Sequence, residues 1–170
     1  MKAATQSPLE DTIHRFVLVL GGSSLCRMNM LHESIKHHLR AYEAAKIGII
    51  CDPSIRNTTS WAQSVSSFSS SISTVHVSTD SELAARIKGR RFSMLCIPDL
   101  SEFASRKVLY LASAQLRLHS LPDCAHKWIG SVSAELAPLW VFRAFFGERL
   151  RMDPKYPLFQ KRLSVVECHE

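Results

Sequence analysis

Short apolar runs alternate with amphipathic segments along the first part of the chain. Phe16 to Leu20 and Ile47 to Cys51 are apolar runs, closed by Gly21-Gly22 and by Asp52-Pro53. Runs of this length and composition are typical of buried strands. Between them, apolar residues recur at helical spacing, at Met28, Leu31, Ile35, Leu39 and Tyr42. This spacing predicts an amphipathic helix of about four turns.

The next segments continue the alternation. A short helix carrying Trp61 is predicted over residues 58–65. The serine-rich stretch 64–73 predicts a surface loop with Phe68 and Ile72 tucked inward, and a short strand is predicted over 74–77. Alternating strands and helices predict parallel strands joined by right-handed crossovers.

The sequence pattern over residues 79–118 predicts a helix, a buried strand and a second helix. Thr79 and Glu82 have capping-box spacing, and Gly89 can end the helix in a left-handed turn. Residues 92–97 form a nearly continuous apolar run, which favours a strand covered on both faces. Pro98 ends that strand, and the next helix follows from Asp99.

After residue 118 the pattern loosens. Residues 124–136 predict a helix, 139–146 a strand and 163–167 an edge strand. Together these segments predict a three-layer α/β sandwich with a mostly parallel central sheet.

Length and composition predict a single domain spanning residues 1–170, with a flexible N-terminus over 1–12 and a C-terminal tail over 163–170. The first residues lack the apolar core of a signal peptide, and no apolar run is long enough to cross a bilayer, so we expect a cytoplasmic location without membrane contact. We expect reduced thiols rather than disulfides at the five scattered cysteines, which are Cys26, Cys51, Cys96, Cys124 and Cys168.

The chain carries a net charge of +6, and its pI is about 9.3. A basic balance is compatible with nucleic acid or with an acidic protein partner. The cations fall into two groups, one at residues 86–91 and a looser one over 143–162. Such groups are more typical of a solvated face, so nucleic acid is not the favoured partner.

The sequence offers few candidates for catalysis or metal binding. Gly21, Gly22, Ser23 and Ser24 follow a strand and precede a helix, where backbone amides can hold a phosphate. The lysine and second glycine of a P-loop are missing, so a tight turn is favoured and a divergent phosphate loop is the alternative. His37-His38 and Cys124-x-His126 lack zinc spacing. We therefore expect no metal, no cofactor and no catalytic residues.

Two stretches carry a resemblance to a known family. The stretch IICDPSIRNTTSWAQS, with Pro53 and Trp61, resembles a strand, a proline and a W-x-Q-x-S segment of the SulA family of bacterial SOS cell-division inhibitors. ELAARIKGRRFSMLCIPDLSEFASRKVLYLASAQ is similar to that family's helix, glycine, buried strand and second helix, and Val141-Phe142-Arg143 resembles its late strand. The chain also looks like other RecA-like proteins that lack nucleotide-binding motifs, including the mutasome protein ImuA.

The resemblance implies a RecA-like or Rossmann-like fold and a function without catalysis. The family binds the tubulin-like protein FtsZ and blocks its polymerisation. Matched to this sequence, Lys46 corresponds to a basic residue entering the second strand, Cys51 to an apolar residue before the proline, and Trp61 to the tryptophan. Residues 119–138 correspond to an insertion. With the neighbouring basic group, the candidate partner-binding residues are Lys46, Cys51, Trp61, Arg86, Lys88 and Arg90.

The leading hypothesis is therefore a non-catalytic, protein-binding α/β domain that resembles an inhibitor of FtsZ polymerisation. Trp61 is either a core residue or an interface anchor. One alternative is a DNA-damage accessory protein that binds a recombinase or polymerase. Another is a nucleotide-binding enzyme that uses Gly21 to Ser24. A homodimer is compatible with each of the three.

Overall fold

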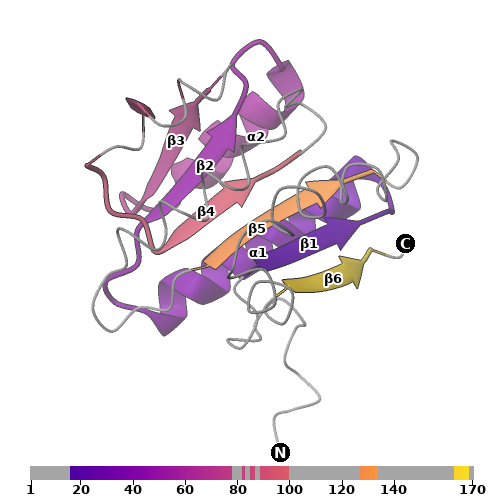
Figure 1. Ribbon diagram of the computed structural model, residues 1–170, viewed down its shortest axis with the longest axis horizontal. Helices are drawn as coiled ribbons and strands as arrows, with labels where there is room; N and C mark the ends of the chain where they lie inside the picture. The colour runs from indigo at the N-terminus through magenta and orange to yellow at the C-terminus, as the bar shows by residue number, and fades with distance from the viewer. Residues whose placement is uncertain are drawn as a thin grey trace, which may run out of the picture.

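The described strands form one parallel sheet in which the first and last strands are neighbours (Figure 1). A computed structural model describes residues 16–77, 82, 85–86, 89–99, 127–133 and 163–168. The strand order is β3-β2-β4-β5-β1-β6, and each neighbouring pair is parallel. The strands are β1 (Phe16–Leu20), β2 (Ile47–Cys51), β3 (Ile72–His76), β4 (Met94–Ile97), β5 (Lys127–Val132) and β6 (Leu163–Glu167). The predicted α/β class and parallel central sheet are confirmed.

Two helices cover one face of this sheet. In Figure 1, α1 (Ser24–Ala41) lies behind β5 and β1, and α2 (Arg56–Ser66) lies behind β2 and β3. The Ser23 hydroxyl caps α1 by accepting a hydrogen bond from the Cys26 amide at 3.1 Å. Residues 82, 85 and 86 are helical, as predicted, and Gly89 adopts a positive φ of 77°. The rest of the predicted helix over 79–88, and that after Asp99, lie outside the described residues.

The core lies between the sheet and the two helices. It contains Leu31 and Ile35 of α1, Ala62 and Val65 of α2, and alternate strand residues such as Val17, Ile49, Cys96 and Ile129. Successive strand side chains point to opposite faces. Leu18, Ile50 and Leu95 therefore point to the other face, where they are also fully buried. The sheet is buried on both faces, which explains why its strands are nearly continuous apolar runs.

Several sequence predictions are corrected. Residues 124–136 were expected to be helical, but residues 127–132 form β5, a central strand between β4 and β1. The isoleucine and valine of KWIGSV favour a strand, and β5 supplies hydrogen bonds to two neighbours. Residues 119–138, matched to an insertion, thus include a strand of the central sheet. Phe68 was expected to be tucked inward but is 63% exposed.

Other predictions are confirmed or fall outside the described part. Residues 163–167 form an edge strand, as predicted, because β6 pairs only with β1 in the described sheet. The predicted helix over 58–65 is longer at both ends, and β3 begins earlier than predicted, at Ile72. The flexible N-terminus over 1–12 and the strand over 139–146 lie outside the described residues.

The expectation of reduced thiols is wrong for two of the cysteines. Cys26, in the first turn of α1, forms a disulfide with Cys168, directly after β6. Their sequence separation of 142 hid this pairing, which depends on β6 returning beside β1. Cys51 and Cys96 are free and buried, and Cys124 lies outside the described residues. Burial raises the pKa of the Cys96 thiol, so this group stays protonated.

The disulfide predicts a redox-dependent stability. It closes a loop across most of the chain, and removing such a link typically costs about 2–5 kcal/mol of stability. We expect Cys168→Ser to lower the free energy of unfolding by that amount in urea melts. Reductant should destabilise the wild type to a similar extent and leave Cys168→Ser unchanged. A wild-type melt that does not respond to reductant would contradict the role of this bond.

Candidate functional site

The turn between β1 and α1 lies at the carboxyl end of a parallel strand, where α/β proteins commonly bind ligands. Gly21 and Gly22 have φ values of 77° and 62°, in the left-handed region that glycine adopts readily. Ser23 caps the helix that follows. The predicted strand–turn–helix arrangement of Gly21 to Ser24 is therefore present.

The interior of this turn is occupied by a protein cation. Arg27 is 5% exposed, and one of its guanidinium nitrogens donates to the Gly21 carbonyl at 3.0 Å and to the Gly22 carbonyl at 2.7 Å. A phosphate loop instead turns backbone amides toward its anion. Because two carbonyl oxygens face the guanidinium, the polarity here is that of a cation site already filled by the chain.

The outer side of the turn is covered by the end of β6. A Cβ atom on Gly22 would lie 2.9 Å from the Cys168 carbonyl oxygen and 3.2 Å from its sulfur. The Cys168 amide also donates to the Leu20 carbonyl at 2.7 Å. This close approach explains the glycine at position 22 without a ligand. It also means that a bulky residue there would disturb packing, so Gly22 variants cannot serve as a test of nucleotide binding.

Asp52, at the carboxyl end of β2, has a structural partner. One of its carboxylate oxygens accepts hydrogen bonds from the Ser54 amide at 2.9 Å and the Ser54 hydroxyl at 2.8 Å. Its backbone carbonyl accepts from the Ile55 amide and the Thr59 hydroxyl. Asp52 therefore shapes the turn that leads into α2.

A buried polar network lies at the opposite, amino end of the sheet. The Ser93 hydroxyl lies 2.8 Å from the His38 Nε2 atom, accepts from the Lys46 amide at 3.0 Å and lies 3.1 Å from the Lys46 carbonyl. Ser93 is fully buried and His38 is 3% exposed. In the sequence, His37-His38 lacks zinc spacing, and nothing there predicts this role for His38. The network joins the last turn of α1 to the starts of β2 and β4.

His38 is neutral near pH 7. Its pKa is lowered from 6.5 to about 4, chiefly by burial and also by the nearby positive charges of Lys127 and His37. Lys127, the first residue of β5, is 8% exposed. A serine beside a histidine is a familiar nucleophile pair, but a fully buried Ser93 cannot reach a substrate. The cluster therefore stabilises the amino end of the sheet.

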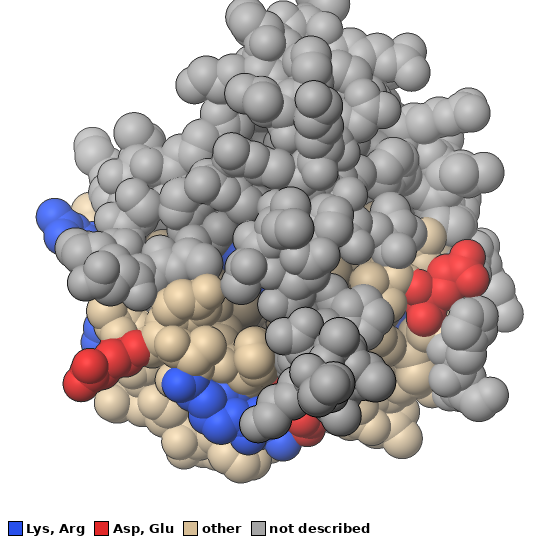
Figure 2. Space-filling model, turned by 90° about the horizontal axis from the view of Figure 1, so that it is seen from below, with Lys and Arg blue, Asp and Glu red and all other residues tan. Residues whose placement is uncertain are grey.

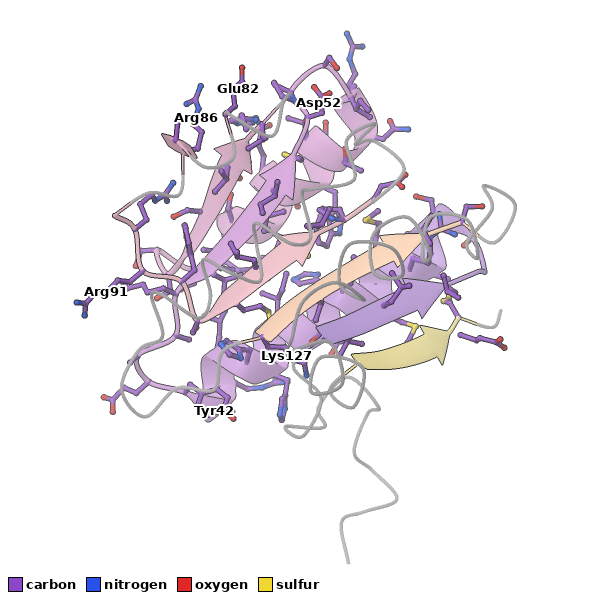
Figure 3. All side chains as sticks on the ribbon, in the orientation of Figure 1. Tyr42, Asp52, Glu82, Arg86, Arg91 and Lys127 are labelled. Atoms are coloured by element: carbon purple, nitrogen blue, oxygen red, sulfur yellow. A yellow bond between two sulfur atoms is a disulfide. The ribbon has the colours of Figure 1, made fainter. Side chains whose placement is uncertain are left out.

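The predicted partner-binding residues do not form one surface. Lys46 and Arg90 are exposed and precede β2 and β4, which are neighbouring strands. The Arg90 guanidinium lies 4.8 Å from the centre of the Phe92 ring. Arg86 is also exposed, but it lies near Glu82 on the connection between β3 and β4, apart from Lys127 (Figure 3).

The remaining predicted residues have different surroundings. Trp61 lies on α2 and is partly buried against the core, so it is neither fully enclosed nor fully free. Cys51 is 1% exposed, so its side chain is not part of the surface. Lys88 lies outside the described residues. The enclosure of Arg27 leaves no signal in the sequence, because its partners are backbone carbonyls.

The role assigned to Arg27 can be tested directly. Arg27→Met removes the donor shared by two turn carbonyls, and we expect a loss of about 2 kcal/mol in the free energy of unfolding. Neither inorganic phosphate nor ATP should raise the melting temperature of the wild type, because the turn is already filled. A saturable rise with ATP that Arg27→Met abolishes would instead favour the phosphate-loop alternative.

The pKa of His38 predicts a loss of stability in acid. Because its pKa is about 4 when folded and near 6.5 when unfolded, the unfolded chain binds more protons between these pH values. The contribution of His38 is complete above pH 6.5, and about 3 kcal/mol is lost as the pH falls to 4. His38→Gln should flatten this part of the stability curve, measured by urea melts at several pH values. Ser93→Ala, which keeps the histidine, should retain the slope; equal slopes in wild type and His38→Gln would contradict the prediction.

Comparisons with known proteins leave the family open. No family model, no curated protein and no solved structure matches the chain. Within the part of the chain that the structure describes, no helix is long and apolar enough to span a membrane. The same part holds no group of three or more His, Cys, Asp or Glu side chains placed to bind a metal ion.

Proposed function

We propose that this chain is a non-catalytic protein-binding domain that acts as a division inhibitor, binding FtsZ and blocking its polymerisation. The proposal follows from the sequence resemblance to the SulA family. The structural observation that supports the proposal is the filled β1–α1 turn, where Arg27 and Cys168 occupy the two sides of Gly22. A turn closed by protein groups favours a binding domain over a nucleotide-using enzyme.

Lys46 and Trp61 are the residues that this proposal needs on a surface. Lys46 is exposed at the start of β2, and Trp61 is partly exposed on α2. Tryptophan that is half-enclosed by its own protein is common at binding hot spots, because it can bury its remaining area against a partner. Cys51 supports the core behind these residues and does not contact the partner.

The proposal also places the chain in the cytoplasm, where thiols are kept reduced. In that compartment Cys26 and Cys168 would be thiols rather than the disulfide seen here. Any functional assay should therefore be run on both redox forms, and the reduced form is the one that the proposal requires to be active.

The deciding experiment is FtsZ assembly with GTP, followed by sedimentation. With the reduced chain added up to equal stoichiometry, we expect pelleted polymer to be lost near a one-to-one ratio, without GTP hydrolysis by the chain itself. Trp61→Ala and Lys46→Glu should each weaken the inhibition at least tenfold. Arg56→Glu, an exposed charge reversal at the start of α2, is the matched control and should inhibit normally.

Stability separates a contact role for Trp61 from a core role. A fully buried tryptophan costs about 3–5 kcal/mol when it is truncated to alanine. Since Trp61 is only partly buried, we expect a smaller loss and a folded variant. Polymer that pellets normally with wild-type chain at equal stoichiometry would overturn the proposed function.

A further inference from the structure

The amino ends of four strands lie side by side. The Ile47 amide donates to the Ser71 carbonyl, the Ser93 amide to the Lys46 carbonyl, and the Lys127 amide to the Ser93 carbonyl, each at 2.8 Å. These bonds place the starts of β3, β2, β4 and β5 in a row. Adjacent strands are about 4.8 Å apart, so the row spans roughly 14 Å. The last turn of α1 joins this row through His38 and Ser93.

This edge of the sheet is basic. Among the described residues at this end of the strands and α1 (38–46, 67–71, 89–93 and Lys127), five are cations and one, Glu43, is an acid. The cations are Arg40, Lys46, Arg90, Arg91 and Lys127, and all except Lys127 are exposed. None of the exposed four forms an ion pair with another described residue. In Figure 3, Arg91, Lys127 and Tyr42 lie at one end of the sheet, and Asp52 and Glu82 lie at the other.

Polar and aromatic groups accompany these charges. The serine-rich loop 67–71 leads into β3 and lies beside the start of β2, where the Ser71 carbonyl accepts from the Ile47 amide. The same loop holds Phe68, which is 63% exposed. Its ring contacts His32 of α1 edge-on, with ring centres 4.9 Å apart. Seen from below, Lys and Arg side chains lie beside uncharged surface and a small acidic patch in the lower centre of the view, with further acidic groups toward either side (Figure 2).

Compensation of helix dipoles does not account for this arrangement. The carboxyl-terminal end of a helix is partly negative and favours a nearby cation, which explains Arg40 in the last turn of α1. Arg90 and Arg91 precede a strand, and strands have only small net dipoles. The exposure of Phe68, in the loop that leads into β3, is not explained by compensation either.

We propose that this amino edge binds single-stranded nucleic acid. Arg40, Lys46, Arg90 and Arg91 would contact backbone phosphates, and Phe68 would stack on a base. Sites for single strands combine a basic track with aromatic side chains, because every base has a face on which a ring can stack. Guanidinium groups and serine hydroxyls are both suited to phosphate oxygens. This inference goes beyond the proposed function and does not depend on FtsZ binding.

Nucleic acid fits this surface better than an acidic protein. An acidic protein face would also pair with the cations, but a single strand offers phosphates for the cations together with flat base faces for Phe68. The pI of about 9.3 also lies in the range typical of nucleic-acid-binding domains. If four cations each contact a phosphate of a single strand, affinity should fall about 50-fold between 50 and 200 mM salt.

The experiment is fluorescence anisotropy of a labelled single-stranded oligonucleotide titrated with the full chain. We expect saturable binding with the salt dependence given above. Arg91→Glu combined with Lys46→Glu should weaken binding at least tenfold. It should also make the slope of log affinity against log salt concentration shallower by about 1.4. Phe68→Ala should weaken binding about fivefold or more with little change in that steepness.

Matched controls lie at the other end of the molecule. Arg56→Glu reverses an exposed charge at the start of α2, and Leu25→Ala truncates an apolar side chain that is 70% exposed at the start of α1. Both should bind like the wild type. Circular dichroism of every variant checks that it remains folded.

Three results would overturn the inference. The first is no saturable binding by the folded wild type at 50 mM salt. The second is an equal loss of affinity in the control variants, because the contacts would then be spread over the whole basic surface. The third is equally effective competition by polyglutamate or by duplex of the same length, since an acidic protein or double-stranded DNA would then account for the binding. FtsZ inhibition is measured separately, so either proposal can fail without the other.

Discussion

The fold depends on bringing the two ends of the described chain together at β1. This strand is the first in the sequence, yet it pairs with the last two strands, β5 and β6, rather than with β2. Parallel pairing of distant segments carries a large loop-closure cost before any contact forms. The Cys26–Cys168 disulfide joins the same two regions, because it links the start of α1 to the residue after β6. The close packing of Cys168 on Gly22 follows from this junction.

The two edges of the sheet differ for physical reasons. At the carboxyl edge, polar groups of the chain hydrogen-bond to one another. Arg27 fills the β1–α1 turn, Asp52 shapes the β2–α2 turn, and the Ser131 hydroxyl donates to the Pro98 carbonyl. At the amino edge, the polar groups that hydrogen-bond to one another are buried, as in the His38–Ser93 pair. The four exposed cations at this edge form no ion pair with a described residue. Among the described residues, they give the amino edge a net positive charge.

Most strands and both described helices follow from the sequence, because their apolar residues recur with the right period. The edge position of β6 was also predictable. The strand at β5 was missed because Gly130 and Ser131 interrupt its apolar pattern, and only its two neighbours on the sheet make it a central strand. The disulfide was missed because sequence spacing cannot show that β6 returns to α1. Local pattern predicts elements, whereas these features depend on tertiary pairing.

The candidate site was less predictable, for a related reason. The family resemblance identified Lys46 and Trp61 as candidates and charge identified Arg90, but neither predicted their neighbours. Exposure of Phe68 could not be inferred, since phenylalanine in a short loop is ordinarily packed inward. Lys46 now belongs to both proposed surfaces, because it lies at the amino edge and is matched to the inhibitor family. If both proposals hold, a protein partner that covers Lys46 and a nucleic acid strand that contacts it would exclude each other, so that binding one partner would release the other.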